Sequence, residues 1–166
     1  IGHELTHGFD DQGSQFDASG NMVMWWTETD FKNFKDKTQG IINQFNNYVA
    51  IDTLKVKGAQ TQGENIADLG GLTMSYYAYK KSLGTNPSPK IGGYTGEQRF
   101  FIAWAQGWKT ICRPEEMKRL LTIDFHSPGK FRAFAPLTNM KEFYEAFNVK
   151  AGEQMWTPDD KRVEIW

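Results

Sequence analysis

The chain has 166 residues, of which 39% are apolar and 14% aromatic, so it is long and apolar enough to form one domain with a buried core. This composition excludes a disordered or low-complexity chain. Its 19 Lys and Arg residues nearly balance 20 Asp and Glu residues, and no run of like charge favours nucleic acid or an acidic membrane surface as a partner. We also expect no membrane contact from this segment, because no apolar stretch approaches the length of a membrane span.

The first element expected is the end of a helix over residues 1–8, closed by Gly8. Because the chain starts at Ile1, inside this pattern and without a Met, we expect an N-terminal part of the same protein to precede it. Residues 9–26 are rich in Asp, Gly, Ser and Asn, which predicts an ordered loop. We expect the tryptophans at its end, residues 25–26, to pin this loop to the core.

Apolar residues at helical spacing predict five further helices. Thr27 and Asp30 form a predicted capping box, and Pro114 suits the first turn of a helix. Asn139 is the expected N-cap of the last helix, where it forms a capping box with Glu142. The predicted ranges are 27–49, 61–83, 97–111, 114–121 and 140–147.

No segment alternates apolar and polar residues as a half-buried strand does, so the sequence predicts a mainly α fold. Residues 84–93, rich in Gly and Pro, form a predicted surface loop, and residues 151–166 match no pattern. The lone Cys112 excludes an internal disulfide. We expect it to be a small buried residue and not a nucleophile, since no histidine follows nearby to activate it.

Residues 3–7 read His-Glu-Leu-Thr-His, a spacing that carries chemistry when it lies on a helix. Histidines four apart share one helix face, close enough for both imidazoles to reach one zinc ion at about 2.0 to 2.1 Å. Glu4 lies about 100° around the helix from His3, where its carboxylate can address a water molecule beside the metal. The alternative is that His3 and His7 are ordinary polar residues on an exposed helix face.

Glu64 and Asp68 open the second long helix and share a face, because they also lie four residues apart. Two like charges there call for a cationic group nearby. Glu64 is a candidate third zinc ligand in a site with an open fourth position, and Asp68 a candidate acceptor for the free N–H of a liganding histidine. The alternative is a solvated acidic start of a helix.

The third segment, residues 124–132, contains the remaining histidine, His126, and Arg132. A loop rich in Pro and Gly is able to hold both side chains towards a substrate. Alternatively, His126 is a surface residue and Arg132 half of a salt bridge.

Taken together, residues 3–11, 63–71 and 125–132, with the terminal Trp166, resemble the neprilysin family of zinc endopeptidases (family M13), a gluzincin group. The resemblance extends along essentially the whole chain. It implies that residues 1–166 are the C-terminal portion of a single thermolysin-like zincin catalytic domain, with the upstream sheet and the helical lid domain absent.

The resemblance also implies a role for each candidate at the metal. His3, His7 and Glu64 would bind one Zn²⁺ per chain, Asp68 would orient a zinc-binding histidine, and Asp10 would be a second supporting carboxylate.

For the catalytic residues, the resemblance implies that Glu4 is the general base and that Asp68 assists through a histidine. His126 would stabilise the oxyanion of the tetrahedral intermediate, and Arg132 would hydrogen-bond to a substrate carbonyl. The family commonly has Asn-Gly after this arginine, whereas residues 133–136 here are Ala-Phe-Ala-Pro, which puts the substrate-side wall in doubt.

The resulting hypothesis is a zinc-dependent endopeptidase that cleaves oligopeptides in a periplasmic or extracellular compartment. We expect this chain alone to be inactive, because the family encloses its substrates between two domains. We also expect its zinc site to be looser than in the whole protein, or empty, because the first helix lacks its upstream turns and the N-terminal partner surface. The alternative is a non-catalytic helical module that zinc stabilises. The free carboxylate of Glu4 argues against it, since a structural site has no use for an uncoordinated carboxylate beside the metal.

Overall fold

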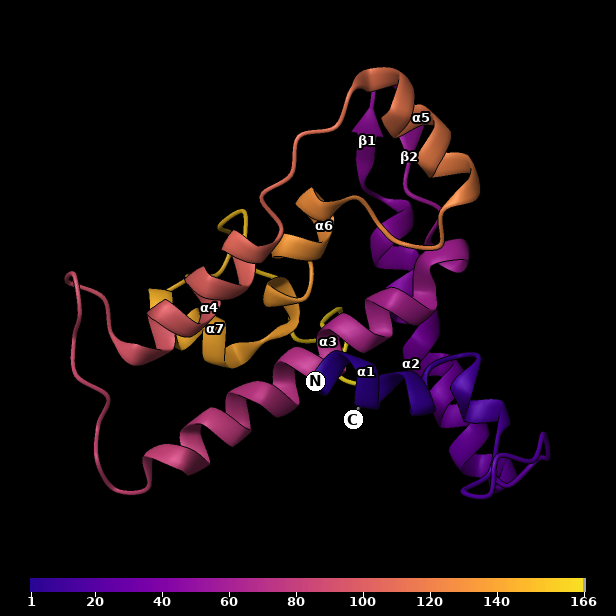
Figure 1. Ribbon diagram of the computed structural model, residues 1–166, viewed down its shortest axis with the longest axis horizontal. Helices are drawn as coiled ribbons and strands as arrows, with labels where there is room; N and C mark the ends of the chain where they lie inside the picture. The colour runs from indigo at the N-terminus through magenta and orange to yellow at the C-terminus, as the bar shows by residue number, and fades with distance from the viewer. Residues whose placement is uncertain (166) are drawn as a thin grey trace.

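Helices form most of the computed structural model, which describes residues 1–165 (Figure 1). Trp166, part of the resemblance above, lies outside the described residues. The mainly α prediction is confirmed. In chain order, the elements are α1 (Gly2–Thr6), the 3-10 turns η1 (His7–Phe9) and η2 (Gly13–Gln15), α2 (Glu28–Asn46), β1 (Val49–Ile51), β2 (Leu54–Lys55), α3 (Gly58–Leu83), α4 (Gly96–Gly107), α5 (Pro114–Ile123), α6 (Gly129–Phe134), η3 (Leu137–Asn139) and α7 (Lys141–Phe147).

Several helix starts follow the expected chemistry. The hydroxyl of Thr27 accepts a hydrogen bond from the backbone N–H of Asp30, which caps α2 as predicted. Pro114 occupies the first turn of α5, where its missing N–H is no loss. Helix α4 begins one residue earlier than predicted, behind a capping box of Thr95 and Gln98, and ends at Gly107 instead of residue 111.

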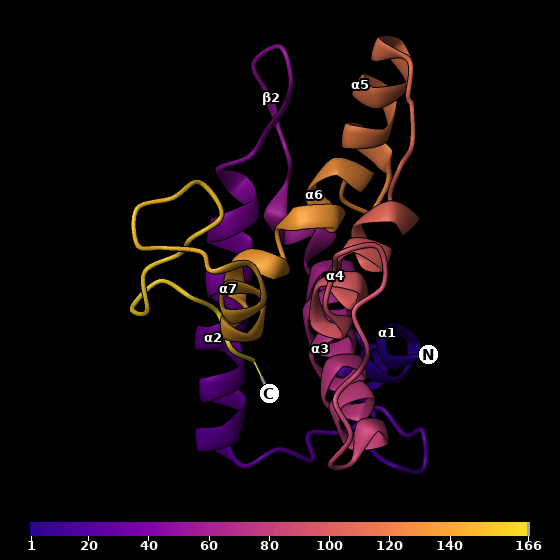
Figure 2. The ribbon, with the colours of Figure 1, turned by 90° about the vertical axis from the view of Figure 1, so that its left-hand side faces the viewer.

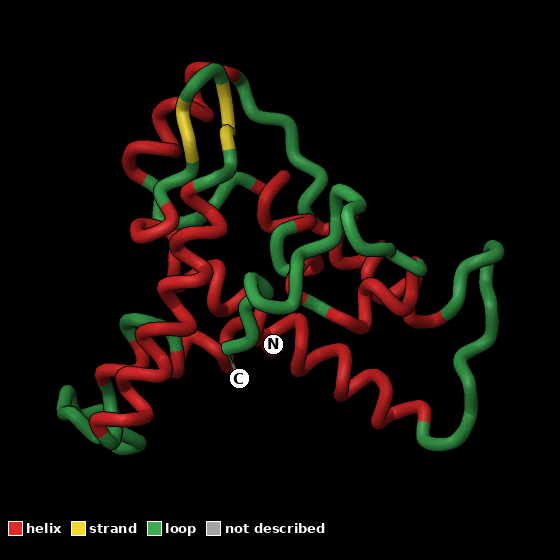
Figure 3. The backbone as a smooth tube through the Cα atoms, turned by 180° about the vertical axis from the view of Figure 1, so that it is seen from behind, coloured by secondary structure: helices red, strands yellow, loops and turns green. Residues whose placement is uncertain are grey.

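The predicted helix over residues 27–49 is wrong at its end, because α2 stops at Asn46. The side chain of Asn46 instead accepts a hydrogen bond from the N–H of Gly58, so α3 starts three residues before the predicted position. Between the two helices lies an antiparallel hairpin of β1 and β2, yellow in Figure 3, which turns at Asp52 with a positive φ of 50°. Strands this short leave no alternating pattern to detect.

Asn139 is not the N-cap of α7, which begins behind Met140 without a side-chain cap. The amide of Asn139 instead fastens the C-terminal segment to the core. Its oxygen accepts from the backbone N–H of Val163 at 3.0 Å, and its nitrogen donates to Gln44 at 2.8 Å. A buried amide that links two segments has the same local sequence as a cap, which explains the error.

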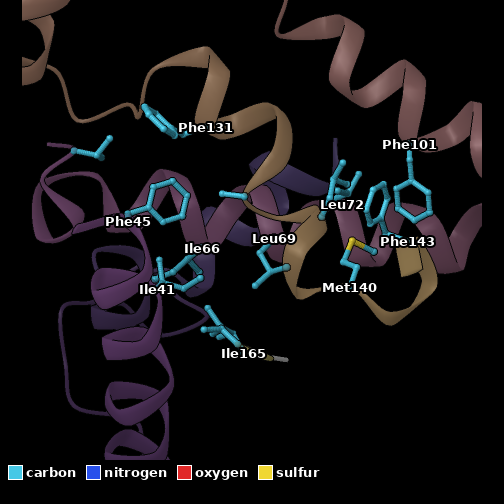
Figure 4. Close-up of a cluster of buried hydrophobic side chains, with 14 of the residues drawn as sticks. Ile41, Phe45, Ile66, Leu69, Leu72, Phe101, Phe131, Met140, Phe143 and Ile165 are labelled. Atoms are coloured by element: carbon cyan, nitrogen blue, oxygen red, sulfur yellow. The ribbon is translucent and has the colours of Figure 1, made fainter. Parts of the chain in front are cut away.

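The core follows α3, which packs against α2 on one side and faces α4 and α7 on the other (Figures 1 and 2). Cys112 is only half-buried, so its predicted place in the core is wrong. None of the helices described here is long and apolar enough to cross a membrane. The buried side chains labelled in Figure 4 are Ile41, Phe45, Ile66, Leu69, Leu72, Phe101, Phe131, Met140, Phe143 and Ile165.

Trp26 pins the loop over residues 9–26 to the core, as predicted, whereas Trp25 is 43% exposed and its indole bonds within the loop. The indole N–H groups of Trp25 and Trp26 both donate to the carbonyl of Ser14, at 2.9 and 2.8 Å. The Trp26 ring also stacks on Phe34 of the core. The loop that follows η1 is therefore a fixed part of the fold.

Helix α1 crosses α3 at unusually close range through glycines. A Cβ atom on Gly71 would lie 2.3 Å from the backbone nitrogen of His3, and one on Gly2 would lie 2.5 Å from the carbonyl oxygen of Gly71. Only glycine allows such an approach of two backbones. The predicted closure of the first helix at Gly8 is wrong. The α-helix ends at Thr6, and a 3-10 turn over His7–Phe9 runs past Gly8.

Candidate metal centre

The crossing of α1 and α3 brings three potential zinc ligands together. His3 Nε2 lies 3.0 Å from His7 Nε2 and 3.3 Å from Glu64 Oε2, and His7 Nε2 lies 3.5 Å from Glu64 Oε1. Donors about 2.0 to 2.2 Å from a tetrahedral zinc ion lie about 3.3 Å from one another. The three side chains therefore fit one zinc ion with a fourth position left open.

The outer nitrogen of each histidine meets a buried carboxylate. His3 Nδ1 lies 2.8 Å from Asp68 Oδ1, and His7 Nδ1 lies 2.7 Å from Asp10 Oδ2. The other oxygen of Asp10 accepts two backbone N–H bonds, which fixes this carboxylate in the loop. A proton held at Nδ1 leaves Nε2 free to bind a metal. The hydrogen bond with Asp68 raises the pKa of His3, although partial burial lowers it.

Arg132 is the cation that the two acidic residues of α3 require. Its Nε donates to Asp68 Oδ2 at 2.7 Å, and its Nη2 donates to Asp68 Oδ1 at 2.8 Å and to Glu64 Oε2 at 3.1 Å. The guanidinium lies 4.1 Å from the ring centroid of Trp108, and the indole of Trp104 donates to the carbonyl of Arg132. The sequence prediction missed both tryptophans; Trp104 lies in α4 and Trp108 directly follows it, and their spacing of four residues is the local signal.

The predicted loop around Arg132 is wrong in part, because α6 starts at Gly129 and carries the arginine. A Cβ on Gly129 would lie 2.9 Å from the Thr110 hydroxyl and 3.1 Å from the Trp108 carbonyl. The glycine therefore lets the first turn of α6 pack closely against the end of α4.

His126 lies in the loop between α5 and α6, with its side chain 41% exposed. Its Nε2 atom is 3.3 Å from Glu64 Oε1, so the imidazole borders the three donors. Asp124 Oδ1 accepts from both the backbone N–H of His126, at 2.9 Å, and ring Nδ1, at 2.8 Å. Burial raises the pKa of Asp124, but these hydrogen bonds outweigh it and leave the pKa below its usual value.

The sequence prediction missed Asp124 as a partner of His126. The signal available was an Asp two residues before a histidine in a loop, which is the spacing of an Asx-turn.

Glu4 is exposed and lies beside the donors without being one of them. It faces an open cleft of about 540 Å³ that collects all the predicted site residues except Asp10, which lies behind His7. The cleft is lined by His3, Glu4, His7, Glu64, Asp68, Trp104, Trp108, Phe125, His126 and Arg132.

Two known proteins match the chain along its whole length. It is 42% identical to an endothelin-converting enzyme homolog of Locusta migratoria and 44% identical to neprilysin-2 of Drosophila melanogaster, covering 100% of this chain and 23% and 22% of those proteins. The chain thus spans less than a quarter of the length of these relatives.

Solved structures agree with these sequence relatives. The inhibitor complex of the zinc metalloprotease ZMP1 of Mycobacterium tuberculosis matches with a TM-score of 0.97 and 44% identity, over 99% of this chain and 26% of that one. PEPO from Lactobacillus rhamnosis matches with a TM-score of 0.86 and 34% identity, over 99% and 25%. The family model for peptidase family M13 matches residues 1–163, so the chain belongs to this family, as the resemblance to the neprilysin group predicts.

Proposed function

We propose that the protein to which this chain belongs is a zinc-dependent endopeptidase that hydrolyses peptide bonds of oligopeptides. The observation that carries the proposal is the donor set of His3, His7 and Glu64, whose ligand atoms lie within 4.8 Å of one another with a free carboxylate at Glu4 beside them. The family and the names of its members support the same reaction.

His3, His7 and Glu64 would hold one zinc ion per chain, with Asp10 and Asp68 fixing the two imidazoles. When bound, zinc polarises the scissile carbonyl and lowers the pKa of a water molecule to about 7.

Glu4 is the proposed general base. Its exposed carboxylate takes a proton from the attacking water and passes it to the leaving amine, a role that needs no contact with the metal. Asp68 assists at one remove, through its hydrogen bond to His3.

His126 and Arg132 supply hydrogen-bond donors in the same cleft. The Nε2 atom of His126, beside Glu64, is placed to donate to the carbonyl oxygen as negative charge develops there. Arg132 uses Nε and Nη2 for the carboxylates of α3, and no side chain of residues 1–165 accepts from its Nη1. This group is left to bind a substrate carbonyl.

The test is peptide hydrolysis by the full-length, zinc-loaded protein and by its Glu4→Gln variant. We expect the variant to keep its zinc and to lose at least about 100-fold in kcat, the usual contribution of a general base. Glu28→Gln, an exposed substitution on α2, is the matched control and should leave kcat unchanged.

Undiminished turnover by Glu4→Gln would remove Glu4 as the base. No cleavage by the zinc-loaded wild type would favour the non-catalytic, metal-stabilised module instead. A periplasmic or extracellular location remains a prediction, which fractionation of the source cells would check.

A further inference from the structure

The loop that carries His126 is attached to α3 at two points, one on each side of the histidine. Before it, the side-chain amide of Gln60 donates to the carbonyl oxygen of Asp124 at 2.5 Å. After it, the hydroxyl of Ser127 donates to Oδ1 of Asn65 at 2.8 Å. In Figure 1 this loop joins α5 to α6 past the first turns of α3. The exposed histidine is thus held between two fixed neighbours.

The second attachment is buried, although the loop around it is not. Ser127 and Asn65 are 3% and 1% exposed, whereas Phe125 is 61% exposed. The nitrogen of Asn65 donates in turn to the Thr61 hydroxyl at 2.9 Å, which bonds to the backbone carbonyl one turn earlier. Both ends of the Asn65 amide are therefore occupied, and a buried amide satisfied at both ends holds one orientation.

These contacts act differently from the bond between His126 and Asp124. The Asp124 side chain bonds only within the loop, so it sets the orientation of the ring, whereas the Asp124 backbone carbonyl is the atom that Gln60 fastens to the helix. Asn65 is the neighbour of Glu64 in α3. A loop tied to Asn65 is therefore held at a fixed distance from the Glu64 carboxylate, which the imidazole approaches to 3.3 Å.

We propose that Asn65 and Ser127, with Gln60, are positioning residues that set the place of His126 beside the metal ligands and affect catalysis only through His126. The inference rests on the proposed function, since it assigns these residues a part in the same reaction. It explains why a helix that supplies a metal ligand also supplies both attachments of the loop. Helix α3 then determines the positions of both Glu64 and His126.

The test is a double-mutant cycle in the full-length, zinc-loaded protein, using a fluorogenic peptide as substrate. We expect Ser127→Ala to lower kcat about 10-fold, as for other residues that support a catalytic group from behind. We expect no further loss from Ser127→Ala when it is added to His126→Ala. Gln60→Ala, which removes the less buried attachment, gives a second variant with the same expected dependence on His126.

Thr138→Val is the matched control for the loss of a buried hydroxyl bond between two segments. Thr138 accepts from Gln44 at 3.0 Å, away from the cleft. The Thr138→Val variant should be less stable than the wild type but have the same kcat and the same zinc content.

The positioning role is overturned if Ser127→Ala and Gln60→Ala both leave kcat unchanged. It is also overturned if they lower kcat equally with and without His126. An inactive wild type would instead overturn the proposed function, and the two failures are told apart by the wild-type assay.

Discussion

The backbones of His3 and Gly71 lie so close together that a Cβ atom on Gly71 would come within 2.3 Å of the His3 nitrogen. This contact sets the distance between the helix that carries the two histidines and the helix that carries the two acidic residues. The arrangement of the three zinc-ligand candidates therefore depends on Gly71, which has no side chain and takes no part in the chemistry itself.

Gly71→Ala should separate these helices. Alanine normally stabilises a helix interior relative to glycine by up to about 1 kcal/mol, but here the methyl group meets backbone that has no room to shift. We expect a net loss of about 1 to 3 kcal/mol in stability, as for overpacked cores. We also expect zinc affinity to fall at least about 10-fold, the lower end of the effect of disturbing ligand orientation.

The measurements are zinc titration and urea unfolding of the full-length protein. Gly8→Ala is the matched control, because a Cβ there meets nothing within 4 Å. The expected tenfold loss of zinc affinity corresponds to about 1.4 kcal/mol. If the zinc affinity of Gly71→Ala stayed within about twofold of the wild type, the role of this crossing would be contradicted.

The sequence predicts the ligand chemistry well because that chemistry is local. His3 and His7 lie one helical turn apart, as do Glu64 and Asp68, and periodicity alone places each pair on one face. Their meeting across α1 and α3 cannot be read from spacing. It depends on Gly2, at the start of α1, and on Gly71, inside α3, and neither glycine carries a chemical signal of its own.

Several parts of the fold that the sequence mispredicts are places where one side chain has two possible partners. Asn139 resembles an N-cap but binds the C-terminal segment, and Asn46 caps a helix that begins 12 residues later in the chain. Asp124 likewise satisfies a loop and a histidine at once. Local patterns identify such residues as polar anchors, while the choice of partner is made by tertiary packing.

Zinc binding should depend on pH through the contact between His3 and Asp68. The hydrogen bond to Asp68 raises the pKa of His3, while partial burial lowers it, and the net pKa is above the usual value. A proton and zinc compete for Nε2. Zinc affinity should therefore be full above this raised pKa and fall as the pH drops through it.

Asp68→Asn should move the onset of this loss to a lower pH, because the carboxylate that favours the charged imidazole is gone. It should also weaken zinc binding about 10- to 100-fold at high pH, since the orienting acceptor is lost. Competition with a chelating dye between pH 5.5 and 8 gives both quantities. Asp124→Asn, which removes the carboxylate beside His126 instead, should leave the profile unchanged; identical onsets for wild type and Asp68→Asn would contradict the assignment.

Arg132 should be worth more to stability than any exposed cation of the chain. It neutralises Glu64 and Asp68, which are both buried, and its fork matches the Asp68 carboxylate with two bonds. Removing one partner of a buried ion pair costs about 3 to 5 kcal/mol, because the charge left behind is neither solvated nor paired. Arg132→Met keeps most of the volume of the side chain and removes its charge.

We therefore expect Arg132→Met to lower the free energy of unfolding of the zinc-free, full-length protein by about 3 to 5 kcal/mol, measured by urea and tryptophan fluorescence. The free energy of unfolding of Arg132→Lys should lie between those of the wild type and Arg132→Met, since an ammonium cannot bind the carboxylate with two parallel bonds. Arg119→Met breaks the exposed pair with Glu116 and should change stability little. Equal losses for Arg132→Met and Arg119→Met would contradict this account. A smaller loss for Arg132→Met with zinc bound is expected, because the metal then carries part of the charge that Glu64 otherwise requires from Arg132.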